Sequence, residues 1–469
     1  MSARAIFIGG TASNAGKSWM TTAICAWLRS RGVAVAPFKA QNMSNNSYPC
    51  RGGGEIGRAQ VAQAEACGLE PEPAMNPILL KPNGNGSSQV VVNGSVWKTL
   101  SARDYYKHVN ELRDHVIAAY RKLARRFDFI VIEGAGSVTE LNLRDVDLAN
   151  LGLATRLRTP WILVADIERG GVFASVIGTI GLLTPREKAL FRGFAINKFR
   201  GDRSLFDEGV KTLETRTGTP CLGVFPFASH IALDAEDTLA IDTGPRQQAR
   251  SAPSIAIVRL PCISNATDFR LLTWAEWISH PPLREFDFVI LPGTKNTMGD
   301  LRWLRQTGLA GWITDQHRRG ATVVGICGGF QMLGRRIEDP ARVESPEAAA
   351  EGLGLLPAET VMQTAKTTAI RTAWSRGGVR FSAYEIHMGE TTVDAAVQPF
   401  ARLDDGRADG ACVSGIIGTY LHGAFEDPEV CAETFGVEVA AVPKADHYRR
   451  LAEWFSTYAS RLDFLECSE

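Results

Sequence analysis

The amino-acid sequence predicts an α/β protein with two doubly wound domains, for three reasons. Short, continuously apolar segments alternate with longer amphipathic ones, as the strands of parallel sheets alternate with their covering helices. The chain has 469 residues, more than one hydrophobic core usually supports. A polar stretch containing Pro and Gly, at residues 240–254, separates two series of these segments and has the composition of an interdomain linker.

The first domain is expected at residues 1–245. Its predicted strands lie at 5–8, 33–37, 129–132, 161–165 and 193–197, and its clearest helices at 19–31 and 102–127. The second domain is expected at 254–440, with strands at 254–260, 286–291 and 321–326. The Ala- and Glu-rich stretch 342–351 is interpreted as a surface insertion, and residues 441–469 as a helical tail. This order of strands and helices is typical of doubly wound sheets.

The composition argues against several classes of protein. The 51 basic side chains balance the 51 acidic ones, so no overall basic surface for a nucleic-acid partner is indicated. No apolar run approaches the roughly 20 residues that span a bilayer, so no membrane partner is expected. The nine cysteines form no CxxC pair, and their odd number fits reduced thiols better than a disulfide framework. We therefore expect a cytoplasmic protein.

A glycine-rich segment follows the first predicted strand and precedes a helix. Its backbone N–H groups can surround phosphates, and the helix N-terminus adds a favourable dipole. Lys17 can reach the β- and γ-phosphates, and the Ser18 hydroxyl can coordinate Mg²⁺. The spacing departs from the standard phosphate loop, because five residues instead of four separate Gly10 from Gly16. ATP is the predicted ligand, and the predicted nucleotide-binding residues are Gly10, Thr11, Ser13, Ala15, Gly16, Lys17 and Ser18.

Carboxylates follow the strand at 129–132. Glu133 stands at its carboxyl end, where α/β proteins bind ligands, and is predicted as a second Mg²⁺ ligand beside Ser18. The alternative is an acid that caps a helix. Asp145 and Asp147 can hold metal or orient a substrate, although a solvated helix start explains them nearly as well. Asn197, before Lys198, has the position of a base-recognition loop.

The segment 321–334 has the form strand, Gly-x-Cys-x-Gly, helix. Small residues around Cys327 permit the sharp turn that exposes a nucleophile above a sheet. The helix N-terminus favours the thiolate, and the N–H of Gly328 can serve an oxyanion hole with one from the loop at Gly293. A lone cysteine is more often an inert buried residue, but this context favours a nucleophile.

A cysteine nucleophile needs a base, and His422 ends an apolar strand near the close of the second domain. His387 is a second candidate, with a structural or interface role preferred. The group that orients His422 is not identified, because Ala424 stands where many cysteine amidotransferases carry a glutamate. Either another group such as Glu385 orients the histidine, or the site works as a dyad.

With these motifs, nearly the whole chain resembles the cobyric acid synthase family. The first half is also similar to dethiobiotin synthetase, a P-loop NTPase-like fold, and the second half to class I glutamine amidotransferases. The resemblance rests on the phosphate loop, the Glu133 motif and the Cys327 and His422 motifs. It also rests on the segments 39–46, 142–147, 164–173, 197–202, 263–269, 291–297 and 384–389.

The resemblance implies a chemistry. ATP, with Mg²⁺, phosphorylates side-chain carboxylates of a corrinoid, and ammonia from L-glutamine converts the acyl phosphates into amides. Four carboxylates (b, d, e and g) of (adenosyl)cobyrinic acid a,c-diamide would react, giving (adenosyl)cobyric acid. Cys327 would be the nucleophile and His422 its acid and base. Lys39 and Asn42, in the segment 39–46, are candidate residues for substrate binding or phosphoryl transfer.

Two alternatives remain open. A cobyrinic acid a,c-diamide synthase or related amide synthase would share both halves, but its segment 39–46 is expected to be more acidic. A partitioning-type ATPase switch would carry an extra lysine where Ala12 stands. The sequence leaves the oligomeric state undetermined, with a homodimer as one option, and it does not define the path of ammonia between the sites. The broad corrinoid requires an open cleft, at a domain or subunit boundary.

Overall fold

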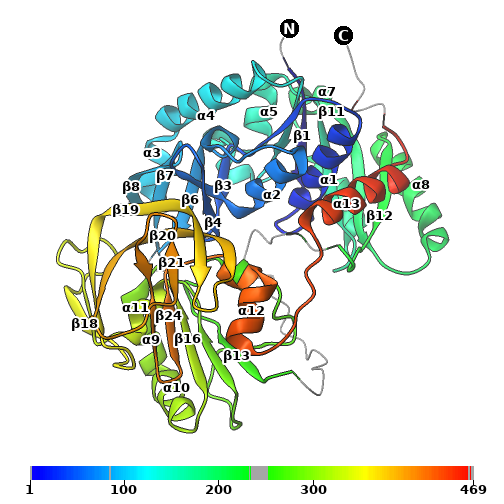
Figure 1. Ribbon diagram of the computed structural model, residues 1–469. Coiled ribbons are helices and arrows are strands. Elements are labelled where there is room, and N and C mark those ends of the chain that lie inside the picture. The colour runs from blue at the N-terminus through cyan, green and yellow to red at the C-terminus, as the bar shows by residue number, and fades with distance from the viewer. Residues whose placement is uncertain (1–2, 84–85, 232, 234–251, 463–464, 466–469) are drawn as a thin grey trace.

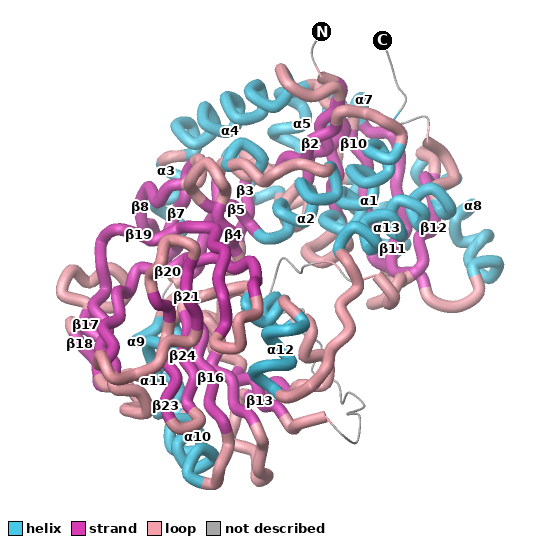
Figure 2. The backbone as a smooth tube through the Cα atoms, in the orientation of Figure 1, coloured by secondary structure: helices cyan, strands magenta, loops and turns pink. Residues whose placement is uncertain are grey.

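The structure is a computed structural model that describes residues 3–83, 86–231, 233, 252–462 and 465. Figures 1 and 2 show two α/β lobes in contact along one side. The predicted fold class is confirmed, because each lobe contains a six-stranded, largely parallel sheet flanked by helices. Of the predicted linker at 240–254, residues 240–251 lie outside the described residues.

The first sheet has the strand order β12-β11-β10-β1-β9-β2, and its neighbours run parallel. Each predicted strand of this domain is present within two residues at either end. The strands are β1 (Arg4–Gly10), β2 (Val35–Phe38), β9 (Phe129–Glu133), β10 (Trp161–Asp166), β11 (Phe191–Phe199) and β12 (Cys221–Pro226).

Successive side chains of the central strands enter two different cores. Ile6 and Ile8 pack on the face covered by α1 (Lys17–Ser30) and α13 (Lys444–Tyr458). Phe7 packs on the opposite face, which is covered by other helices. These are α4 (Val109–Ala124), α5 (Leu151–Leu157), α6 (Val172–Gly181) and α8 (Asp207–Thr217), with α7 (Pro185–Leu190) beside them. Burial on both faces explains why these strands are apolar throughout.

A smaller layer lies between β2 and α4 in the chain and was not predicted. It contains a four-stranded sheet and a two-stranded sheet. Their strands are β3 (Gln41–Met43), β6 (Ile78–Pro82), β7 (Ser87–Val92) and β8 (Ser95–Ser101), then β4 (Ser47–Pro49) and β5 (Glu55–Gly57), with α2 (Arg58–Cys67) following β5. The predicted helix 102–127 is wrong as one element. His108 has non-helical φ and ψ of −100° and 6° and separates α3 (Ala102–Lys107) from α4.

The second sheet has the order β14-β13-β15-β16-β24-β23, parallel except for the β23–β24 pair. Its strands are β13 (Ile255–Val258), β14 (Glu276–Ile278), β15 (Phe288–Leu291), β16 (Thr322–Ile326), β23 (Ala411–Val413) and β24 (Ile416–Thr419). The helices of this lobe are α9 (Thr297–Gln306), α10 (Leu309–Arg318), α11 (Gly328–Leu333) and α12 (Pro428–Phe435).

A long antiparallel arm extends from the second lobe. It pairs β19 (Ala358–Ser375) with β20 (Arg380–Val393) and reaches β4 of the first lobe, as Figure 1 shows. Four short strands complete its sheet, namely β17 (Arg336–Glu338), β18 (Ala349–Glu351), β21 (Ala401–Leu403) and β22 (Ala408–Asp409). Within the described part of the chain, no helix combines the length and the apolar character needed to cross a bilayer.

The predicted helical tail is present as α13, but it does not extend the second lobe. The chain crosses back and docks α13 on α1 and β12 of the first lobe (Figure 1). Trp454 is 6% exposed, packs against Phe225 in a tilted arrangement with ring centroids 4.9 Å apart, and lies edge-on to Trp19 at 5.9 Å. Its indole N–H donates to the Pro226 carbonyl at 3.1 Å. The last described helix therefore completes the core of the first domain.

We predict that Trp454→Ala destabilises the nucleotide-side lobe. The change removes a buried indole and leaves a cavity, which should lower the free energy of unfolding by about 3–5 kcal/mol. Urea unfolding monitored by circular dichroism measures the effect. Trp374→Ala, which removes a 38% exposed indole from the arm, is the matched control and should cost far less. Equal losses in the two variants would contradict the prediction.

Candidate active sites

Cys327 occupies a strained turn between a buried strand and a helix. It follows β16 directly, has φ 52° and ψ −109°, and precedes α11. A non-glycine residue seldom adopts a positive φ, so the surrounding contacts must enforce it. The Cys327 N–H donates to the Thr419 carbonyl of β24 at 2.8 Å, which fixes the turn to the neighbouring strand.

The glycines around Cys327 are required by close approach of the backbone. A Cβ at Gly329 would lie 2.0 Å from the Leu291 carbonyl oxygen, and one at Gly325 would lie 2.7 Å from the Gly329 backbone. The helix can therefore begin only if both positions lack a side chain. The sequence pattern and the turn thus have the same steric cause, and the turn directs the thiol toward the domain interface.

The thiol lies beside a buried histidine–carboxylate pair. His422 Nδ1 is 2.7 Å from Asp268 Oδ2, and both side chains are 1% exposed. The other oxygen of Asp268 accepts the Gly423 N–H at 2.8 Å. A hydrogen bond also joins His422 to Cys327. Since Nδ1 is committed to the carboxylate, Nε2 is the nitrogen left to face the sulfur.

The charge state of His422 follows from these neighbours. Burial on its own would lower the pKa of His422, because it penalises the charged ring. The Asp268 carboxylate and the hydrogen bond to Cys327 outweigh burial and raise that pKa to about 10. The imidazolium form is therefore favoured at neutral pH, and a cation adjacent to the sulfur stabilises a thiolate.

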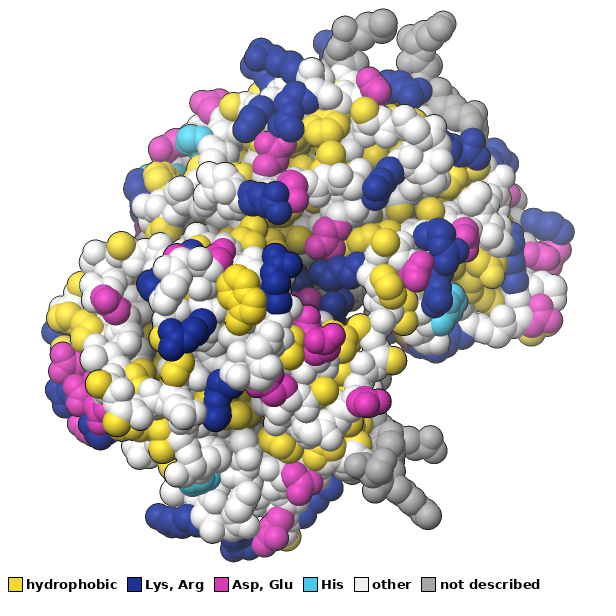
Figure 3. Space-filling model, in the orientation of Figure 1, with side chains coloured by type: hydrophobic (Ala, Val, Ile, Leu, Met, Phe, Trp, Pro, Cys, Tyr) yellow, Lys and Arg dark blue, Asp and Glu magenta, His cyan; other side chains and the backbone are white. Residues whose placement is uncertain are grey.

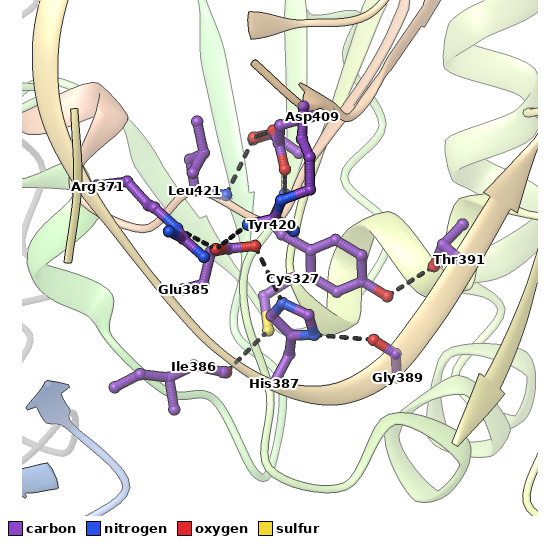
Figure 4. A network of polar contacts seen from close by, with 12 residues as sticks. Cys327, Arg371, Glu385, Ile386, His387, Gly389, Thr391, Asp409, Tyr420 and Leu421 are labelled. Atoms are coloured by element: carbon purple, nitrogen blue, oxygen red, sulfur yellow. Dashed lines mark hydrogen bonds and ion pairs between the residues drawn. The ribbon is translucent and has the colours of Figure 1, made fainter. Parts of the chain in front are cut away.

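Asp268 is the orienting group that the sequence analysis failed to identify. Glu385, the suggested candidate, is wrong: it pairs with Arg371 at 2.5 Å and approaches His387 Nε2 at 3.5 Å, away from His422. Figure 4 shows Glu385 between Arg371 and His387. The dyad alternative is also wrong, since a carboxylate is present. Asp268 lies in a short 3-10 turn, Ala266–Phe269, that no spacing rule links to His422.

His387 has a packing role next to the thiol. Its ring stacks on Tyr420 with centroids 3.9 Å apart, and Nδ1 lies 2.8 Å from the Gly389 carbonyl. The Cys327 thiol lies 3.6 Å from the Ile386 carbonyl of the same strand, as Figure 4 shows. The arm strand β20 therefore forms one wall of the cysteine site.

A small cavity of about 30 Å³ adjoins Cys327 and is lined by both domains. The first domain contributes Asn45 and Lys81, and the second contributes Lys295, Lys366 and Glu344 among others. Glu344 belongs to the stretch interpreted as a surface insertion. That interpretation is incomplete, because Glu344 accepts the Thr297 N–H at 3.1 Å and lines the cavity.

The two predicted oxyanion residues lie on either side of this site. Gly328 lines the cavity, and a Cβ there would lie 2.6 Å from the Thr294 side chain. Gly293 is beside the histidine, since a Cβ there would lie 2.7 Å from His422 Cε1. Among the described residues no carbonyl takes the N–H of either glycine, so both remain candidates for binding an oxyanion.

The predicted phosphate loop joins β1 to α1. Gly16 has φ 99°, and a Cβ there would lie 1.9 Å from Asn197 Nδ2. Asn197 donates to the Ala15 carbonyl at 3.0 Å, so it braces the loop from β11. Lys17 Nζ donates to the carbonyls of Ala12 and Gly136, at 3.0 and 2.7 Å. The lysine thus spans the concave side of the loop.

Glu133 collects three polar groups at the end of β9. Its Oε1 accepts from Ser18 Oγ at 2.7 Å and from Lys39 Nζ at 2.9 Å, and its Oε2 accepts from Gln63 at 2.5 Å. The carboxylate is fully buried. Ser18 and Glu133 thus bring two hard oxygen donors together beside the loop, which fits Mg²⁺. No group of three or more His, Cys, Asp or Glu among the described residues could hold a metal, so phosphate oxygens would have to complete the shell.

A larger cavity of about 620 Å³ lies above the phosphate loop. Ser13, Lys17, Lys39, Asn42 and Asp147 line it. Five other predicted loop residues do not line it, namely Gly10, Thr11, Ala15, Gly16 and Ser18.

The acidic candidates near this cavity behave differently. Asp147 accepts the N–H groups of Ala149, Asn150 and Gly152 at 2.7–2.9 Å, so both its oxygens cap the start of α5. Asp145 is exposed and does not line the cavity. The geometry favours the helix-start interpretation for Asp147. Pro261 and Ile263 of the second domain also line the cavity, and Figure 3 shows charged side chains in the hollow between the lobes.

We predict that Asp268→Asn slows alkylation of Cys327. Loss of the carboxylate lowers the pKa of His422 from about 10, so the ring is neutral between pH 7 and 9 and no longer stabilises a thiolate. The rate with iodoacetamide, followed by mass spectrometry of the peptide containing residue 327, should fall roughly 10-fold in that window. Near pH 10 and above the two proteins should react alike. Asp315→Asn, on the exposed face of α10, is the control; identical pH profiles for Asp268→Asn and wild type would contradict the assignment.

Comparison with known proteins agrees with both halves of the structure. The CobQ/CobB/MinD/ParA nucleotide binding domain matches residues 6–241, and the CobB/CobQ-like glutamine amidotransferase domain matches residues 254–430. A protein of Parabacteroides distasonis named cobyric acid synthase is 45% identical over 473 residues, covering 96% of this chain and 95% of its own.

Two further proteins with the same name extend this relationship. That of Rhodococcus jostii is 46% identical over 435 residues, covering 90% of this chain and 84% of its own. The protein of Dehalococcoides mccartyi is 42% identical over 451 residues, covering 91% of this chain and 89% of its own. With this identity over both domains, the chain belongs to the cobyric acid synthase family.

Proposed function

We propose that the chain amidates a corrinoid at the expense of ATP and glutamine. Four carboxylates (b, d, e and g) of (adenosyl)cobyrinic acid a,c-diamide become amides, giving (adenosyl)cobyric acid. The observation that carries this proposal is that the two candidate sites meet at one domain interface, where each cavity is lined by residues of both domains. Family membership supports the choice of substrate.

The second domain releases ammonia from glutamine in this proposal. The Cys327 sulfur attacks the side-chain amide carbon, and the carbonyl oxygen takes negative charge that the N–H groups of Gly328 and Gly293 receive. His422 gives its proton to the amide nitrogen, the C–N bond breaks, and ammonia leaves a thioester. Water then hydrolyses the thioester to glutamate and returns the proton to His422. Asp268 holds the ring with Nε2 toward the sulfur throughout.

The first domain activates the carboxylate. The carboxylate oxygen attacks the γ-phosphoryl group of ATP, the bond to the bridging oxygen breaks, and ADP leaves. Ammonia then attacks the acyl phosphate, and phosphate leaves with the proton that the nitrogen loses. Lys17, across the concave side of the loop, is placed to neutralise charge on the transferred group. Lys39 supplies a second cation beside Glu133. Mg²⁺ bound by Ser18 and Glu133 would add positive charge to the phosphates.

The larger cavity suits a polar, multiply substituted substrate. Its lining includes the amide side chains of Gln41, Asn42 and Asn46, which can donate N–H groups to carboxylates without adding negative charge. Asn42 is held by Gln60 at 2.8 Å. This amide-rich lining favours cobyric acid synthesis over a,c-diamide synthesis. The partitioning-type switch is disfavoured because it leaves the Cys327–His422–Asp268 arrangement without a purpose. A cytoplasmic location and a homodimer remain predictions.

We predict that Cys327→Ala abolishes glutamine-supported amidation while ammonium-supported amidation stays within about two-fold of wild type. The variant lacks only the nucleophile that releases ammonia. The assay incubates the protein with cobyrinic acid a,c-diamide, ATP and Mg²⁺, and follows the mass change of the corrinoid with either nitrogen source. Cys412→Ala, outside the site, is the control. Loss of both activities in a folded Cys327→Ala protein would count against separate roles for the domains.

We predict that Lys17→Ala impairs amidation from both nitrogen sources, by roughly 10²-fold or more, because both require the same activated carboxylate. Glutamate release measured without the corrinoid should change little. Lys211→Ala, on the exposed face of α8, is the matched control. Near-normal amidation by Lys17→Ala would remove the lysine from the proposed step.

A further inference from the structure

The two cavities adjoin at a shared layer of lining residues. Asn45 lines both of them, and the next segment in contact divides between them, with Ile263 on the nucleotide side and Ser264 on the cysteine side. The first domain contributes Asn45 and Lys81 to the cysteine cavity, and of these two only Asn45 also lines the nucleotide cavity. Asn45 therefore stands where the two candidate sites adjoin.

Asn45 carries a buried acceptor with no partner. Its Oδ1 has no hydrogen-bond donor among the described residues and is shielded from solvent. Buried polar atoms are nearly always paired, so an unpaired carbonyl oxygen between two cavities indicates that a donor arrives during function. Ammonia offers three N–H donors and is small enough for this position.

The backbone on both sides of Asn45 is fixed. Asn46 Oδ1 accepts the Asn265 N–H at 2.7 Å, and Asn265 Oδ1 accepts the Ser47 N–H at 2.9 Å. The Asn46 N–H also donates to Ser44 Oγ at 3.0 Å. These hydrogen bonds join the two domains at this segment, so Asn45 is held in the layer between the two cavities. Asn265 is three residues before Asp268. The same short segment therefore carries both the contact between the domains and the partner of His422.

Burial around the cysteine cavity favours neutral ammonia. Lys81, Lys295 and Lys366 line the cavity together with Glu344, and Lys81 and Lys366 pair with the buried Glu55. Burial lowers the pKa of Lys81 to about 7, and burial also lowers the pKa of Lys295. Burial that disfavours a charged lysine also disfavours ammonium, and only neutral ammonia is a nucleophile.

We propose that Asn45 accepts the ammonia released at Cys327 and passes it into the nucleotide cavity. This inference rests on the proposed function and assigns a positioning residue to it. Ammonia donates an N–H to Asn45 Oδ1 and crosses the layer as a neutral molecule, without making or breaking a covalent bond. Its lone pair then attacks the acyl phosphate, and phosphate leaves.

Isotope competition tests whether ammonia is transferred directly from the cysteine cavity to the nucleotide cavity. The full-length enzyme receives glutamine labelled with ¹⁵N in the side-chain amide, together with unlabelled ammonium in the solution, and the label in the corrinoid amides is measured. Wild type should incorporate mainly ¹⁵N. Asn45→Leu retains the branched shape of the side chain and Asn45→Ala shortens it, but both remove the acceptor. Each should lower the ratio of ¹⁵N to ¹⁴N in the product at least five-fold, with ammonia appearing in the solution.

Three further measurements make the outcome decisive. Glutamate release and amidation by excess ammonium alone should stay within two-fold of wild type in both variants, which also establishes that they are folded. Asn110→Leu, on the exposed side of α4, is the matched control and should keep the wild-type ratio. An unchanged ratio in either Asn45 variant would overturn the proposal. So would a parallel loss of ammonium-driven amidation, since Asn45 would then bind the corrinoid. If wild type amidates no corrinoid with either nitrogen source, the proposed function itself is wrong.

Discussion

The arrangement of both sites depends on one buried carboxylate at the domain interface. Glu55 of the first lobe pairs with Lys81 at 2.9 Å and with Lys366 of the arm. Burial would raise the pKa of Glu55, but the two ammonium groups reverse this and hold it well below its usual range. Removing one partner of such a buried group leaves an uncompensated charge, which is strongly unfavourable. The cluster therefore holds the arm on the first lobe, and the same arm carries the strand that walls Cys327.

Aromatic and ionic contacts extend this interface to His422. Tyr384 of the arm stacks on His422 at 5.4 Å, and Tyr48 of the first lobe packs on Tyr384 at 4.7 Å. Arg58 lies over both tyrosine rings and pairs with Glu426 at 2.8 Å. The small layer of the first domain thus lines the nucleotide cavity and also touches the support of His422. If substrate binding shifts that layer, the aromatic contacts that support His422 shift with it. This gives a physical basis for coupling the two reactions.

Much of this could be predicted from the sequence, and the omissions have physical causes. Strands buried on both faces are continuously apolar, so the parallel sheets and the turns at Lys17 and Cys327 were visible as local patterns. The arm was missed because its strands contain no continuous apolar run, and the middle of β19 is exposed or half-buried. Asp268 was missed because it approaches His422 only through tertiary folding, 154 residues away. Its only sequence signal was the segment 263–269, which had been noted for the family resemblance without a role.

The return of α13 to the first lobe has a consequence for biosynthesis. Trp27 and Phe225 are buried partly by residues of this helix, which is translated after the second domain. A growing chain emerging from the ribosome holds an unfinished nucleotide domain, with an apolar face bare, until the whole amidotransferase domain has been made. Topologically the second domain is an insertion within the first. The cores of the two domains are thereby completed together, and a chain that stops before α13 lacks part of the core of the first domain.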